Sequence, residues 1–180
     1  MDNPATLLTA IMFVTILGMA IGNLLMTCAD IAGGLRDPKP ERIHLSWMIL
    51  LLLAMLNLFW ETTQILDVTD WAFPDFLYMI CGPMILLFAT GVITAPASPE
   101  EDGSHYFSIS PRFFTMMALQ EVWLIGLDLR YDTFGVETLI SAVLLVLLIV
   151  LAISRGRSLH IAGNAVAWIG FVSPLPLSMI

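Results

Sequence analysis

Acidic side chains within an otherwise apolar sequence are the residues most able to do chemistry in this chain. Glu121 and Asp128 lie seven positions apart in one apolar stretch, with Gln120 directly before the glutamate. On a helix this spacing puts both carboxyl groups on one face, about two turns apart. An ionisable group at membrane depth is costly without a partner or water, so such a pair is typical of sites that handle protons or cations.

A second polar face lies earlier in the sequence. Asn57, Glu61 and Gln64 follow one another at i, i+4 and i+7, which puts all three side chains on one side of a helix. We predict that this face forms the outer part of an ion or proton path centred on the deeper glutamate. The predicted path comprises Glu121, Asp128, Glu61, Asn57, Gln64 and Gln120.

A structural interpretation of the same residues is an alternative. A protonated Glu121 could hydrogen-bond Gln64 or Asn57 and only fix the packing of the helices. The sequence leaves both interpretations open, because identical side chains can line a path or seal an interface.

The composition explains why these acids are unusual. Apolar residues make up 58% of 180 residues, charged residues only 12%, and the mean hydropathy is +0.89. These values are typical of a multi-pass membrane protein, with the lipid bilayer as its surroundings. A net charge of -8 with only seven Lys and Arg residues argues against nucleic acid and against a polybasic lipid-binding surface.

The elements that must position the acids are long apolar segments. The first has 22 residues without a charge, enough to cross about 30 Å of hydrocarbon as a helix. We therefore predict an all-α membrane protein, a bundle of six transmembrane helices forming a single domain. The predicted spans cover residues 7–28, 44–66, 71–96, 113–131, 137–154 and 159–180, and the polar stretch 97–111 is predicted to be a loop or short interfacial segment.

The basic residues predict the orientation of the six spans. One set of connecting segments carries six of the seven Lys and Arg residues, and the other set carries only Arg130. Cytoplasmic loops are enriched in Lys and Arg, so we expect both termini on the non-cytoplasmic side. The six residues are Arg36, Lys39, Arg42, Arg112, Arg155 and Arg157.

Small residues and one proline predict how the helices pack. Gly18 and Gly22 form a GxxxG spacing in the first span, and Gly163 and Ala167 form a similar small-residue spacing in the sixth. Such faces allow another helix to approach closely, so we expect association through these two spans. Pro83 lies in the middle of the third span, where the missing backbone donor predicts a kink.

Sequence motifs typical of other chemistry are absent or incomplete. Hydrolase, P-loop and dinucleotide-binding motifs are absent, so we do not expect an enzyme. A carboxylate-bridged metal site needs Glu-x-x-His motifs on two facing helices, and no such pair of motifs occurs, so we predict no metal site. His44 and His160 both lie at the cytoplasmic ends of spans and are the only pair suited to haem, but no other residue supports such a site and no cofactor is predicted.

Several interfacial aromatic and helix-packing residues form a pattern over roughly the first 115 residues. The pattern resembles a loosely defined group of small multi-pass bacterial inner-membrane proteins of unknown function. The resemblance implies a bacterial cytoplasmic membrane and no particular activity, and Glu61 stands where that group tends to have a second tryptophan. The residues that carry it are ILGMAIGNLL in the first span, Trp47, Phe59, Trp60, the stretch WAFPDF, Pro83, Pro96, and HYF followed by Arg112, Phe113 and Phe114.

Two functions are consistent with the sequence. The first is a small ion- or proton-conducting channel or transporter subunit that uses a mid-membrane carboxylate. The alternative is a non-catalytic accessory or structural subunit packed in a larger bacterial membrane complex. The first predicts a homo-oligomer as partner, and the second predicts other membrane subunits.

Overall fold

The computed structural model describes residues 4–35, 41–61, 72–96, 105–131 and 135–172, and all regular structure in these ranges is helical. The predicted all-α fold is therefore confirmed for the described part of the chain. The helices are α1 (Pro4–Ala32), α2 (Arg42–Glu61), α3 (Phe73–Ile93), α4 (His105–Arg130), α5 (Val136–Ile153) and α6 (Arg157–Val172).

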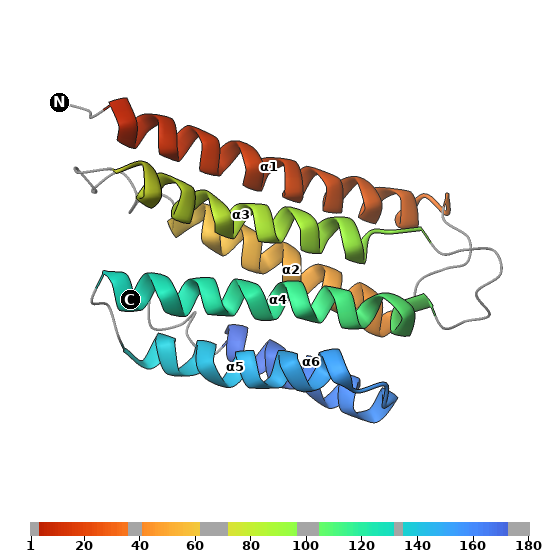
Figure 1. Ribbon diagram of the computed structural model, residues 1–180. Helices are drawn as coiled ribbons and strands as arrows, with labels where there is room; N and C mark the ends of the chain where they lie inside the picture. Colours follow the sequence, from red (N-terminus) through yellow and green to blue (C-terminus); the bar gives the residue numbers. More distant parts are fainter. Residues whose placement is uncertain (1–3, 36–40, 62–71, 97–104, 132–134, 173–180) are drawn as a thin grey trace.

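The helices lie roughly parallel to one axis, and each runs in the opposite direction to the one before it (Figure 1). Helix α4 packs against α3 and α5, α1 packs against α3 and α2, and α6 packs against α2 and α5. Helix α1 consequently runs from left to right in Figure 1, and α6 runs in the opposite direction.

Three helices are long and apolar enough to cross a membrane by length and composition, namely α1, α2 and α3. The apolar part of α5 is shorter. Its outer face carries exposed Leu139, Val143, Val146 and Ile153, spaced as one stripe along the helix. An exposed apolar stripe of this kind is typical of a surface that contacts lipid, and the chain has the features of a helical membrane protein.

Helix α1 presents a single face to the bundle. Phe13, Leu17 and Leu24 lie on this face and are at most 2% exposed. Gly18 and Gly22 lie on the other side, and a Cβ atom added at either position would meet nothing within 4 Å. The predicted GxxxG face therefore makes no close helix contact among the described residues, because the larger apolar side chains make the interface instead.

The sixth helix uses its small residues differently. A Cβ atom added at Gly163 would lie 2.8 Å from Leu151 Cδ1, so this glycine allows α6 to approach α5 closely. Ala167, one turn further along α6, is partly buried against the core. The small-residue faces of α1 and α6 thus have different surroundings, although the sequence had suggested a shared role in association.

Helix α4 begins at His105, eight residues before the predicted start of the fourth span at residue 113. The loop predicted for 97–111 is therefore wrong from His105 onwards, while residues 97–104 lie outside the described residues. Pro111 lacks an N–H group and cannot bond the carbonyl four residues earlier. The Ser110 hydroxyl donates to that carbonyl, Phe107 O, at 3.3 Å, so the helix continues through the proline.

A tight contact joins α3 to α4. Gly82 is buried, and a Cβ atom at this position would lie 2.5 Å from the Trp123 ring, so only glycine leaves room for the indole. Trp123 Nε1 donates to Tyr78 O at 2.8 Å, and Tyr78 Oη donates to Trp123 O at 3.2 Å. Pro83, the predicted kink position, is buried beside this contact and lies within the continuous helix α3.

Candidate functional site

Four helices, α2, α4, α5 and α6, enclose a cavity of about 340 Å³. Three of the residues predicted for the ion or proton path line it, namely Glu121, Asn57 and Glu61. They come from two helices that are far apart in the sequence, so the helical spacing identified residues that the fold brings together. Most of the remaining lining is aliphatic or aromatic.

Glu121 is the deepest acid of the cavity. Its side chain is only 8% exposed, and its Oε2 atom has no hydrogen-bond partner. The Ser141 hydroxyl of α5 also lines the cavity and lies close enough to the Glu121 carboxyl group to interact with it. A buried carboxyl oxygen without a partner is expensive, so this atom is able to accept a proton or a cation.

The cavity reaches the surface at the end of α2. Asn57 and Glu61 are both exposed, and Asn57 Nδ2 donates to Glu61 Oε1 at 2.7 Å. This is the i, i+4 pair expected from the sequence. The opposite end is formed by Trp47 and Phe113, which are buried. The cavity is therefore a pocket with a polar mouth and an aromatic floor.

Trp47 closes the inner end of the cavity. Its indole is 4% exposed, and its N–H group lies near the Tyr106 hydroxyl rather than open to the cavity. The ring is held edge-on to Phe114 with 4.9 Å between the ring centroids. The sequence grouped this tryptophan with the interfacial aromatic residues, and the structure adds that its ring lines the floor of the cavity.

The other predicted path residues lie elsewhere. Asp128 accepts a hydrogen bond from Thr138 Oγ1 at 2.6 Å and does not line the cavity. Gln120 is buried, has an unpartnered Oε1 atom, and is also absent from the cavity lining. Gln64 lies outside the described residues. Asp128 contacts the Thr138 hydroxyl and Glu121 lies near the Ser141 hydroxyl, and both hydroxyl groups belong to α5. Both acids therefore lie on the side of α4 that packs against α5.

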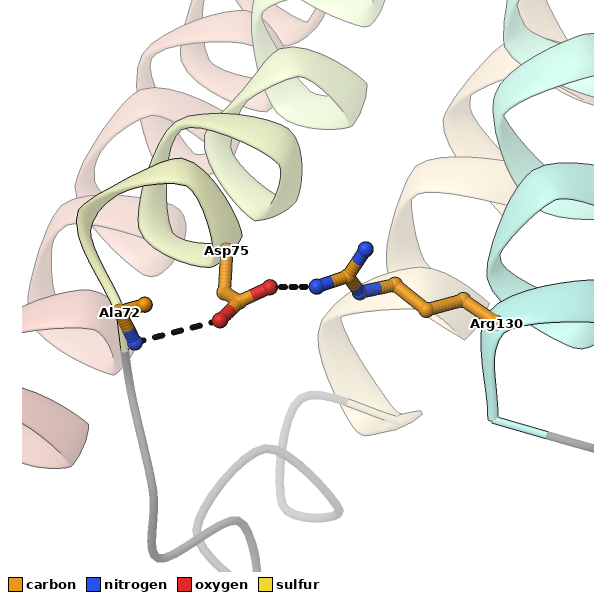
Figure 2. Close-up of polar contacts among 3 residues, drawn as sticks. All are labelled: Ala72, Asp75 and Arg130. Atoms are coloured by element: carbon orange, nitrogen blue, oxygen red, sulfur yellow. Dashed lines mark hydrogen bonds and ion pairs between the residues drawn. The ribbon is translucent and has the colours of Figure 1, made fainter.

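Asp75 has a structural role at the start of α3. Its carboxylate accepts a hydrogen bond from Ala72 N at 3.2 Å and forms an ion pair with Arg130 at the end of α4 (Figure 2). The acid caps the first turn of one helix, and the basic residue lies at the negative end of the other helix dipole. The contact ties together the ends of α3 and α4 that face the same side of the bundle.

A cluster of three histidines and one tyrosine at the other end of the bundle was not predicted. The ring of His44 lies 6.2 Å from that of His105 and 6.0 Å from that of Tyr106. Tyr106 in turn lies 2.9 Å from His160 Nδ1 through its hydroxyl oxygen. Each histidine lies in the first turns of its helix, and this shared position was the feature of the sequence that could have indicated the cluster. The sequence does not show that the three side chains meet, because that depends on how the helices are packed.

Backbone carbonyl groups set the hydrogen-bond roles of two of these histidine rings. His44 Nε2 lies 2.7 Å from Ile93 O, and His160 Nε2 lies 2.9 Å from Ser154 O. A carbonyl only accepts, so both Nε2 atoms carry a hydrogen, and in neutral His160 the Nδ1 atom accepts from Tyr106. Neither histidine of the pair considered for haem presents its Nε2 atom to an iron in this arrangement.

Metal binding has little support in the described chain. Within the ranges described, no group of three or more His, Cys, Asp or Glu side chains is arranged to hold a metal ion. The two acids that line the cavity are the exposed Glu61 at its mouth and the buried Glu121 deeper inside, rather than a compact ligand set.

Fold and cavity together define a helical protein with membrane-compatible apolar helices and an acidic, largely apolar pocket. Comparison of the chain with protein-family models, with curated proteins and with solved structures returns no match.

Proposed function

We propose that all six helices cross a lipid bilayer, with the first residue of α1 and the last residue of α6 on the non-cytoplasmic side. The alternating direction of the helices supports this topology. Arg42 begins α2, and Arg157 begins α6 and lies 3.8 Å from Glu41, which directly precedes α2. Arg130 ends α4 and pairs with Asp75 at the start of α3. The enrichment of basic residues on cytoplasmic sides supports the proposed orientation. The location is the bacterial cytoplasmic membrane that the sequence resemblance implies.

The function that fits this site best is that of a small ion- or proton-conducting membrane protein, with Glu121 as the group that exchanges the ion and with no catalytic role. The observation that carries it is the unpartnered Oε2 atom of a buried glutamate on a cavity that reaches the surface. Acids at membrane depth that face a cavity are typical of ion and proton pathways.

The shape of the cavity favours a transporter subunit over an open channel. The aromatic floor at Trp47 and Phe113 is buried and separates the pocket from the histidine cluster at the other end of the bundle. A path that ends within the protein requires a conformational change to release its cargo, which is the behaviour of a carrier.

Proton flux into liposomes tests this function. A pH gradient should drive uptake of protons through the reconstituted protein, and Glu121→Gln should remove that flux while the protein remains folded. Asp128→Asn is the matched control, because this acid lies on the same helix but does not line the cavity. Equal flux with Glu121→Gln would exclude Glu121 as the exchanging group.

The accessory-subunit function is a second candidate, supported by the exposed Gly18 and Gly22 on α1. A small-residue face that meets no neighbour among the described residues suits a helix of another subunit. The mass and composition of the particle extracted gently from its membrane distinguish the two candidates. A homo-oligomer supports the transporter, and a fixed ratio with larger membrane proteins supports the accessory subunit.

A further inference from the structure

One unsatisfied polar atom lies at the apolar lining of the cavity. Glu121 Oε2 is an acceptor without a partner, although the Glu121 side chain is more than nine-tenths buried. Leucine, isoleucine, methionine and phenylalanine side chains form most of the remaining wall. A ligand that fits this lining must be mainly apolar and must carry one group that interacts with a carboxyl.

The charge of the lining determines the sign of that group. Glu61 and Glu121 both line the cavity. The described residues that line it include no Lys, Arg or His. Ser141 is the polar residue that α5 adds, and α6 adds only Ala167, Gly170 and Phe171. An acidic cavity with low-dielectric walls attracts cations and repels anions.

The size and the aromatic residues of the cavity favour an organic cation over a bare metal ion. A volume of about 340 Å³ lies in the range of sites that take small organic ligands. Trp47, Phe113 and Phe171 supply aromatic faces, which attract ammonium groups through their π-electrons. A hydrated metal ion would instead need several oxygen ligands, and the wall offers few.

We propose that this cavity binds amphipathic organic cations, with one ammonium group on an apolar body the size of an aromatic ring, and that Glu121 is the counter-ion. The inference rests on the proposed function and names its substrate class. When the cation enters, the neutral Glu121 carboxyl loses its proton to water and the carboxylate pairs with the ammonium. When the cation leaves, one proton returns to the carboxylate, so one proton is exchanged for each cation.

Binding of benzyltrimethylammonium to the protein in lipid nanodiscs tests the inference. This probe has a permanent charge, so every proton released on binding comes from the protein. Its neutral isostere, 2,2-dimethylpropylbenzene, has the same shape and controls for apolar binding. We expect the cation to bind, to release a proton in weakly buffered solution, and to bind more tightly than the isostere.

Three variants make the result specific. Glu121→Gln should lower the affinity for the cation about tenfold or more, since a hydrogen bond or ion pair to a charged group is lost, and should abolish proton release. Ala54→Phe should block binding by filling the cavity that Ala54 lines. Asp128→Asn should change neither quantity, because Asp128 lies outside the lining and bonds Thr138.

Several results would overturn the inference. Unchanged affinity with Glu121→Gln, equal binding of the neutral isostere, or no binding of the cation by the wild-type protein would overturn the inference. Proton flux that depends on Glu121 without any binding of the cation would overturn the substrate class and leave the proposed function intact. Cation binding without any flux would support the site and overturn transport.

Discussion

Tyr78 and Trp123 each donate a hydrogen bond to the backbone carbonyl of the other, across the interface between α3 and α4. The indole can reach its acceptor only because Gly82 has no side chain at the point where the two helices meet. This contact fixes the position of α4 and therefore of Glu121, which lies two residues before Trp123. Packing at one face of α4 thus positions the acid on the neighbouring face.

Gly82→Ala should destabilise this interface. The added methyl group would overlap the Trp123 ring, and overpacking of a close interface costs about 1–3 kcal/mol. Unfolding of the purified protein by added sodium dodecyl sulfate, followed by tryptophan fluorescence, measures the loss. Gly91→Ala in the same helix is the control, since a Cβ atom there meets nothing within 4 Å. Equal stability of the two variants would contradict the role of Gly82.

Thr138→Val should weaken the contact between α4 and α5. The threonine hydroxyl donates to Asp128 and accepts from Gly135 N, and valine keeps the shape of the side chain without either bond. We expect a loss of about 1–2 kcal/mol in the free energy of unfolding. Thr138→Ser keeps the hydroxyl and should retain most of the stability. A valine variant as stable as the serine variant would argue that the hydroxyl is dispensable.

Tyr106→Phe should destabilise the histidine cluster. Removal of the hydroxyl leaves His160 Nδ1 without its donor in a fully buried ring, which costs about 1–3 kcal/mol. The same unfolding titration measures the change. Tyr131→Phe is the control, because Tyr131 is exposed. If both phenylalanine variants unfold at the same detergent concentration as the wild type, the hydrogen bond to His160 does not stabilise the fold.

Ser110→Ala tests how α4 passes through Pro111. The serine hydroxyl covers the Phe107 carbonyl that the proline leaves without a helical partner. Its removal should cost about 1 kcal/mol in the natural sequence and much less when Pro111→Ala restores the backbone N–H group. A loss of the same size in both backgrounds would show that the hydroxyl does not compensate for the proline.

The sequence predicted the helical fold and part of the site because both depend on local patterns. Long apolar segments define helices, and the i, i+4 spacing of Asn57 and Glu61 gave their common face. The depth of Glu121 in an apolar stretch identified it as buried. These properties belong to a single helix and do not require knowledge of its neighbours.

The remaining features depend on how helices meet. Asp128 shares the face of Glu121, but the start of α5 covers it with Thr138, so it does not reach the cavity. The cluster of His44, Tyr106 and His160 requires three helices with matching ends. The early start of α4 was missed because Pro111 and the nearby serines suggested a loop, although Ser110 supplies the missing bond.

The accessibility of Ala54 to a polar reagent distinguishes an open cavity beside Glu121 from sealed packing most directly. In a background with Cys28→Ala and Cys81→Ala, the variant Ala54→Cys places a thiol on the cavity wall. Ala89→Cys is the buried control on α3, and Val143→Cys is the control on the apolar outer face of α5.

We expect a membrane-impermeant cationic methanethiosulfonate, added to the protein in liposomes, to modify Ala54→Cys. The thiols of Ala89→Cys and Val143→Cys should stay unmodified, because a buried or lipid-facing thiol does not form the reactive thiolate. If Ala54→Cys is as unreactive as Ala89→Cys, water and cations do not reach the cavity, and Glu121 is a packing residue rather than an exchanging group.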